Sequence, residues 1–244
     1  MLGVFKSKDK LGNRLIVILQ GLPCSWGKCS FCPFSLEQGE LAEVLINNRR
    51  IINKAKELLK SSNVDRVTIF NGGSFFELPY IVITWLREIC KDKIVDIESR
   101  PEFITKESLD NVLETLKPKE LVVRVGFENY DETIRNIILN KGIPQSEIHR
   151  LAKLREEITN YYKLPIKFIA YVLFGIEGVS EESIVMSVKK FNEMFDGVIA
   201  IKYKKYLSTH PNEVPVSKDL AEFLEQNTLL VDWGEGDEWQ ITKQ

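Results

Sequence analysis

Three of the four cysteines lie within nine residues of one another. Cys24, Cys29 and Cys32 form a C-x4-C-x2-C pattern, whereas Cys90 stands alone. In a reducing compartment, clustered cysteines are typical of metal ligands or redox groups rather than of structural disulfides. Gly27 within the segment and a proline at each flank favour a loop that gathers three thiolates around one centre.

The number of ligands separates the kinds of metal centre. A structural zinc site takes four ligands, so Cys90, His149 or His210 would have to complete it. A four-iron cluster on three cysteines leaves one iron open to a small molecule, as catalysis requires. We favour the iron–sulfur cluster, with zinc and incidental clustering as the alternatives. Cys90 lies among apolar residues at helical spacing, which predicts an inert core position.

The elements that must position these cysteines alternate regularly along the chain. Apolar runs that end at glycine or polar residues predict six strands, at 15–21, 67–70, 94–97, 121–125, 166–174 and 197–203. Helical spacing predicts helices between or after them, at 40–60, 79–90, 105–116, 131–139, 146–159 and 181–195. Six strand–helix units predict an α/β fold, a partial (β/α)6 TIM-like barrel.

The last part of the chain breaks this alternation. We expect the barrel to span 1–207 and a C-terminal extension to span 208–244. The extension is predicted to hold a helix over 218–226 and a hairpin that pairs 229–233 with 239–242.

Polar residues and glycines follow the predicted strands. They are the segment from Asn71 through Gly72 and Gly73 to Ser74, then Glu98, Arg100 and Glu128. In parallel α/β sheets, ligands bind at the carboxyl ends of strands, where these residues should meet the cysteine loop. Beyond the sixth strand, a basic and aromatic stretch is a candidate for contacts with RNA phosphates and bases. Its candidate substrate contacts are Lys202, Tyr203, Lys205 and His210.

Composition limits the function classes. The 244 residues include 33 Lys and Arg against 35 Asp and Glu, a net charge of −2, which argues against a general electrostatic grip on nucleic acid. No apolar run reaches the roughly 18 residues of a membrane span, and residues 1–14 lack the apolar stretch of a signal peptide. We therefore expect a cytoplasmic protein without a membrane partner.

The cysteine loop resembles the signature of the radical SAM (radical S-adenosylmethionine) family, typically C-x3-C-x-aromatic-C. Phe31 stands where the family has its aromatic residue, and the first spacing is four residues rather than three, as in some relatives. The resemblance covers about residues 12–205. It implies a partial (β/α)6 barrel, a [4Fe-4S] cluster on Cys24, Cys29 and Cys32, and S-adenosylmethionine (SAM) as second cofactor.

The resemblance also implies roles for the other residues at the strand ends. Phe31 should contact the adenine of SAM, and Asn71, Gly72 and Gly73 lie where the family contacts the SAM amino group. Ser74, Glu98 and Arg100 are candidates for the polar groups of SAM, and Glu128 for its ribose or for a substrate amine.

A narrower resemblance is to the radical SAM component of archaeal archaeosine synthase and, more distantly, to the elongator catalytic subunit. Its motifs are the segments 70–76, 98–105, 125–128 and 140–142. This resemblance implies carbon–nitrogen bond cleavage in a lysine adduct of 7-deazaguanine at tRNA position 15, which forms archaeosine. The implied partners are tRNA, an enzyme that supplies the lysine-modified tRNA, and an electron donor. The alternatives are a radical SAM enzyme for a small metabolite or peptide, and a non-catalytic iron–sulfur or zinc protein.

Overall fold

A single curved sheet of eight strands forms the centre of the computed structural model, which describes residues 2–234, without the side chains of residues 35 and 36. The strands follow one another in sequence order, and all neighbours are parallel except the first pair, which is antiparallel. Their bounds are β1 Gly3–Asp9, β2 Gly12–Ile18, β3 Arg66–Phe70, β4 Ile94–Ser99, β5 Glu120–Glu128, β6 Ile166–Phe174, β7 Val198–Lys202 and β8 Leu230–Asp232.

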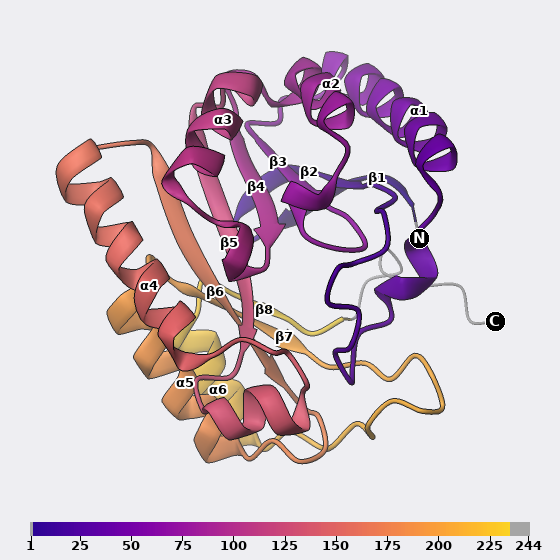
Figure 1. Ribbon diagram of the computed structural model, residues 1–244. Helices are drawn as coiled ribbons and strands as arrows, with labels where there is room; N and C mark the ends of the chain where they lie inside the picture. The colour runs from indigo at the N-terminus through magenta and orange to yellow at the C-terminus, as the bar shows by residue number, and fades with distance from the viewer. Residues whose placement is uncertain (1, 235–244) are drawn as a thin grey trace.

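The helices cover the outer face of this sheet (Figure 1). They are α1 Leu41–Lys60, α2 Tyr80–Cys90, α3 Lys106–Leu116, α4 Gln145–Glu156, α5 Glu181–Met194 and α6 Lys218–Asn227. Serine or threonine caps start three of them, because the side chains of Thr105, Ser180 and Ser217 accept hydrogen bonds from backbone N–H groups of the first turn. Short connections and right-handed crossovers produce this partial barrel.

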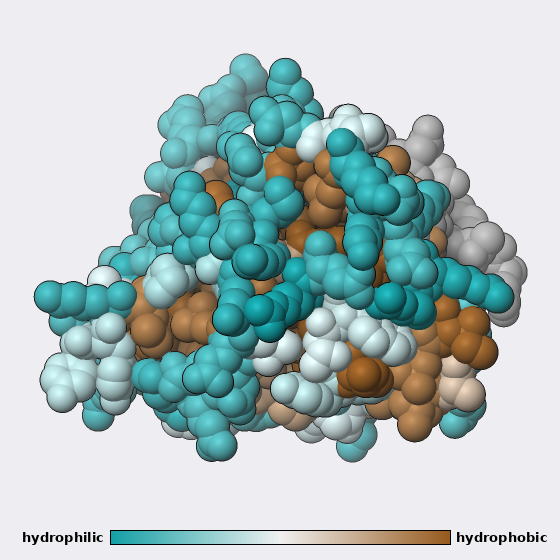
Figure 2. Space-filling model, turned by 90° about the horizontal axis from the view of Figure 1, so that it is seen from above, coloured by the Kyte–Doolittle hydropathy of each residue, from teal (hydrophilic) through white to brown (hydrophobic). Residues whose placement is uncertain are grey.

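The helices are amphipathic, and their apolar faces form the main core with the sheet. Seen from the side of α1–α3, hydrophilic residues dominate the outer surface, and hydrophobic residues show in separate patches (Figure 2). Cys90 is fully buried in this core, as its helical spacing predicted. Its thiol therefore contributes to core packing and lies apart from the cysteine loop.

The inner face of the sheet carries an apolar cluster and a network of charged and polar residues. At the amino ends of the strands, a small apolar cluster includes Val122, Ile169 and Ile199, and Leu11 from the β1–β2 turn packs against it. That turn is fixed because Arg66 Nη1 donates to the Leu11 carbonyl (3.2 Å) and Lys10 Nζ to the Glu225 carbonyl (3.2 Å). The apolar cluster and the turn therefore close this end of the barrel.

A charged network lies beside the apolar cluster, with Asp96 opposite Val122 and Arg124 opposite Ile169 in the sheet. Asp96 is buried at the centre of this network, 3.0 Å from the Arg124 guanidinium, and accepts a hydrogen bond from Thr68 Oγ1 at 2.9 Å. Arg14 in turn donates to Thr68 Oγ1 at 3.3 Å. Four neighbouring strands, β2 to β5, thus share one polar network inside the barrel.

Two elements differ from the sequence-based predictions. Strand β1 was not predicted, because its charged and half-exposed residues do not form an apolar run; it pairs as an edge strand along the whole of β2. The first half of the predicted terminal hairpin forms a strand, β8, which joins the barrel sheet parallel to β7, with Ala200 opposite Val231; its pairing with the second half stays a prediction. The second half, 239–242, lies outside the described residues.

The remaining predicted strands and helices are present with bounds shifted by a few residues. The first predicted strand shows the largest shift: 15–21 becomes Gly12–Ile18, and the cysteine loop begins after it. None of the described helices is long and apolar enough to cross a membrane.

Candidate active site

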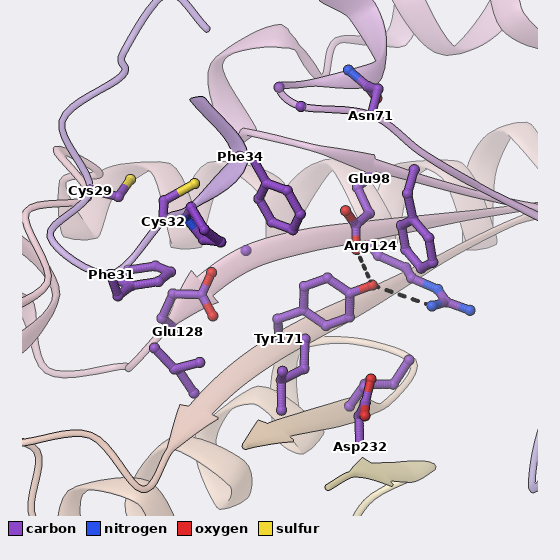
Figure 3. Close-up of a pocket in the computed structure, with 18 of the residues that line it drawn as sticks. Cys29, Phe31, Cys32, Phe34, Asn71, Glu98, Arg124, Glu128, Tyr171 and Asp232 are labelled. Carbon is purple, nitrogen blue, oxygen red and sulfur yellow. Dashed lines mark hydrogen bonds between the residues drawn. The ribbon is translucent and has the colours of Figure 1, made fainter. Parts of the chain in front are cut away.

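A cavity of about 290 Å³ opens at the carboxyl ends of the parallel strands. The sequence-predicted metal and cofactor residues all line it, although they follow four different strands: Cys24, Cys29, Phe31, Cys32, Asn71, Gly72, Gly73, Ser74, Glu98, Arg100 and Glu128. Figure 3 shows Cys29 and Cys32 at one end of the cavity and Asp232 at the other. The structure therefore brings these residues together at one cavity, with the cysteines along one wall, and their roles as ligands stay a prediction.

The three cysteines of the loop are free and half-buried. Burial raises the pKa of the Cys29 thiol, and it raises the pKa of the Cys32 thiol to about 11. Within residues 2–234, no three His, Cys, Asp or Glu side chains converge closely enough to hold a single metal ion. His149 is exposed on α4, and neither Cys90 nor His210 lines the cavity. The structure thus supplies no fourth ligand for a zinc ion beside these thiols.

Glu77, at the end of the short helix η2 (Phe75–Glu77), ties the cysteine loop to the glycine segment. One carboxylate oxygen accepts a hydrogen bond from the Ser25 N–H and the other from the Ser74 N–H, both at 2.8 Å. The contact is close because Gly73 has no side chain: a Cβ there would lie 2.9 Å from Glu77 Oε2 and 3.6 Å from Cys24 Cβ. Gly73 therefore serves the packing of the two loops.

Asn71 carries an unused hydrogen-bond acceptor in the wall of the cavity. The residue is buried, its Nδ2 donates to the Ser74 carbonyl at 3.1 Å, and its Oδ1 has no partner. A buried carbonyl oxygen without a partner is costly unless a ligand supplies the donor. Asn71 therefore fits a ligand that brings an N–H group to this wall.

Arg100 and Ser74 already have partners in the protein. Ser74 Oγ accepts a hydrogen bond from the Arg100 N–H at 2.9 Å. The Arg100 guanidinium donates to Glu102 and to the Lys141 carbonyl at 2.9 Å, and it lies over the Trp26 ring. Both side chains therefore join loops that follow different strands, and their contacts with SAM stay a prediction.

A buried ion pair lies on the wall next to the cysteines. Glu128 Oε1 is 3.1 Å from Lys141 Nζ, and both side chains are more than 90% buried. The Lys141 ammonium also lies over the Phe31 ring, 5.5 Å from its centre. Glu128 has a left-handed backbone (φ 67°) beside a register shift between β5 and β6, which turns its side chain into the cavity.

Glu98 forms the floor of the cavity together with two residues that sequence reasoning missed. The Tyr171 hydroxyl donates to Glu98 Oε1 and accepts from Arg124 Nη1 at 3.3 Å (Figure 3). Burial raises the pKa of Glu98 to about 7, although the Tyr171 hydrogen bond opposes this. The floor is thus a carboxyl group that changes charge near neutral pH.

The basic stretch after β7 divides between the cavity and the surface. Lys202 and Tyr203 line the cavity, whereas Lys205 and His210 do not. Lys205 Nζ donates to Asn212 at 2.9 Å. Neither Lys205 nor His210 is therefore placed to contact a ligand inside the cavity.

Several cavity residues were missing from the sequence-based site. Arg124 and Tyr171 stand inside apolar strands, and a charged residue in a run such as 121–125 is a signal for an internal polar role. Lys141 lies in a loop and Asp232 ends β8, and tertiary contacts bring both residues to the cavity. Glu77 carried only the local signal of a capping box with Ser74, because its other partner, Ser25, is 52 residues away.

Two curated proteins match the chain in sequence. No family model matches it. It is 31% identical over 201 residues to an uncharacterized protein of Methanocaldococcus jannaschii, which covers 76% of this chain and 53% of that protein. It is 26% identical over 188 residues to archaeosine synthase subunit beta of Methanosarcina acetivorans, again 53% of that protein and 72% of this chain. The chain spans about half the length of the curated relatives it matches.

The fold is similar to that of a solved enzyme structure, queuine lyase from Clostridium spiroforme bound to SAM and queuine. The TM-score is 0.72 with 24% identity, over 95% of this chain and 94% of that chain. This likeness confirms the predicted partial TIM-like barrel of the radical SAM type. The resemblance to radical SAM enzymes predicted from the cysteine loop is likewise confirmed at the level of the fold.

Proposed function

Because the chain has the fold of radical SAM enzymes, we propose that it is one, with a [4Fe-4S] cluster on Cys24, Cys29 and Cys32 and with SAM as second cofactor. When bound, these groups supply a 5′-deoxyadenosyl radical that abstracts a hydrogen atom from the substrate, after reduction by an external electron donor. The observation that carries the proposal is the meeting of three free thiols, without a fourth protein ligand in the described residues, at the cavity.

The residues around the cavity fit these groups. A four-iron cluster takes one thiolate per iron, so three thiols that do not converge on a single ion suit it. The unpartnered Asn71 Oδ1 suits the amino group of SAM, and the Phe31 ring offers an apolar surface for adenine. The buried Lys141 ammonium supplies positive charge near Cys29. These side chains would bind and orient the cluster and SAM. The closed amino end of the barrel excludes water from that side of the cavity.

We propose a 7-deazaguanine derivative in tRNA as the substrate, with lyase-type carbon–nitrogen cleavage of a lysine adduct at position 15. The names of two similar proteins, an archaeosine synthase subunit and a queuine lyase, both refer to 7-deazaguanine derivatives. The part of the cavity away from the cysteines suits such a ring, because the lining includes the apolar side chains of Ile199 and Leu230 and the carboxyl groups of Glu98 and Asp232. Carboxylates accept hydrogen bonds from the ring N–H and amino groups of a guanine-type face.

The enzyme class is tested by anaerobic reconstitution with iron and sulfide. Wild-type protein and the Cys90→Ala control are expected to show the broad absorbance of a four-iron cluster and, once reduced, to convert SAM to 5′-deoxyadenosine. The Cys24→Ala variant should lose both properties, because it removes one iron ligand. Failure of cluster-loaded wild-type protein to cleave SAM with any strong reductant would overturn the proposal.

The substrate is tested separately in tRNA. A strain that lacks the gene is expected to accumulate a lysine-bearing nucleoside at tRNA position 15, detected by mass spectrometry of digested tRNA. Plasmid-borne wild-type gene should remove it, and the Cys24→Ala gene should not. Unchanged tRNA nucleosides in the deletion strain would contradict tRNA as substrate and favour a small metabolite or peptide.

A further inference from the structure

The segment 138–142, which begins at the last residue of the π-helical turn η4 (Ile134–Ile138), is joined to the cysteine loop by direct hydrogen bonds. The Trp26 indole N–H donates to the Asn140 carbonyl at 2.7 Å, and Asn140 Nδ2 donates to the Lys28 carbonyl at 2.7 Å. Ser30 donates to the Ile138 carbonyl through its Oγ at 2.9 Å. The two segments are more than 100 residues apart in sequence, so these contacts belong to the tertiary fold.

The Trp26 ring fills a slot that only glycine leaves open. A Cβ at Gly142, where φ is 61°, would lie 2.2 Å from the ring carbon Cη2. The guanidinium of Arg100 lies over the same ring at 5.2 Å from its centre, and Arg100 also donates to the Lys141 carbonyl. The indole is thus held between the 138–142 segment and a cation from the loop after β4.

The 138–142 segment is itself rigid, because a buried arginine organises its base. The Arg135 side chain is fully buried, and it donates to the Ile143 carbonyl at 2.7 Å and to the Asn129 and Tyr130 carbonyls at 2.9 Å. Asn136 adds a reciprocal pair of hydrogen bonds with Ile143, each 2.9 Å long. The cysteine loop is therefore seated on a segment whose own backbone is held by several hydrogen bonds.

We propose that the 138–142 segment is a seat that holds the cysteine loop in its ligand-binding shape, with Trp26 as the main positioning residue. This inference rests on the proposed cluster for its functional meaning. Residues that orient metal ligands change metal affinity by about 10- to 100-fold when they are altered. Loss of the seat should therefore free the loop and weaken retention of iron, without removal of any ligand.

The test compares alanine substitutions at two glycines that both have positive φ. Gly142→Ala places a methyl group in the Trp26 slot, whereas Gly12→Ala, also left-handed (φ 96°), has no atom within 4 Å of the new Cβ. After anaerobic reconstitution, iron transfer to a chelator should be about tenfold faster in Gly142→Ala and Trp26→Ala than in wild type and Gly12→Ala. Trp26→Phe, which keeps an aromatic ring of smaller size but lacks the N–H donor, should fall between them.

A second measurement does not depend on the cluster. In metal-free protein, a maleimide should modify Cys24, Cys29 and Cys32 faster in Gly142→Ala than in Gly12→Ala, while the thermal midpoints of the two variants stay similar. Equal thiol reactivity and equal iron release in the two variants would overturn the seat. If wild-type protein binds no cluster, the proposed function is overturned instead. The seat is then judged by the thiol reactivity of the two variants alone.

Discussion

Glu98 shows how one side chain links the chemistry of the cavity to the stability of the fold. Its carboxyl group is held by the Tyr171 hydroxyl, and burial raises its pKa from an ordinary 4.5 to about 7. The folded chain therefore binds this proton more tightly than the unfolded chain does. Between about pH 4.5 and 7, the Glu98 contribution to stability is lost as the pH rises, because ionisation in the cavity is unfavourable.

The Glu98→Gln variant should remove this pH dependence. We expect wild-type protein to lose on the order of 1–2 kcal/mol more unfolding free energy than the variant between pH 5 and pH 8. Urea denaturation at the two pH values measures the difference. A parallel decline in both proteins would show that Glu98 ionises normally in the folded chain.

At the scale of elements, the charged network inside the barrel couples the neighbouring strands β2 to β5. Asp96 on β4 is 3.0 Å from Arg124 on β5 and accepts a hydrogen bond from Thr68 on β3. Asp96→Asn would leave a buried guanidinium without its counter-charge, which costs about 3 kcal/mol or more. We expect the urea midpoint to fall accordingly.

The matched control is Asp110→Asn, which breaks a half-buried ion pair with Lys106 at the surface of α3. Surface pairs of this kind contribute about 0–1 kcal/mol, so the control should unfold almost like wild type. Equal effects of the two variants would mean that the internal pair does not stabilise the barrel.

The elements show how far sequence reasoning extends. Amphipathic helices such as α1 and apolar strands such as β6 were predictable because each carries its own periodicity. Strand β1 was not, since an edge strand with alternating lysines buries little apolar surface. In the site, Cys24 or Asn71 could be inferred from local motifs, whereas Glu77 and Lys141 depend on contacts between distant loops.

At the scale of the whole molecule, a net charge of −2 implies that the tRNA of the proposed function would be bound by a local patch or through a partner protein. Lys202 and Lys204 line the mouth of the cavity, where such a patch is needed. We expect Lys204→Gln to weaken tRNA binding and to lower the slope of log affinity against log salt by about 0.9. Filter binding at a series of KCl concentrations measures this slope.

Lys60→Gln provides the comparison, because Lys60 is exposed at the far end of α1 and pairs only locally with Glu57. Its salt slope should equal that of wild type. A loss of affinity that is the same for both variants would argue for diffuse attraction, and no change in either would favour delivery by a partner.

The β1–β2 turn, with Leu11 packed against the inner apolar cluster, closes the barrel at the amino ends of its strands. In the described part of the chain, the molecules that react must then share one doorway at the strands' carboxyl ends. Figure 3 places Cys29 and Cys32 at one end of the cavity and Asp232 at the other, so SAM beside the cysteines and a substrate beside Asp232 would reach their places through the same opening. Two reactants that share one opening should compete for it, so a large excess of SAM is expected to slow the entry of the substrate.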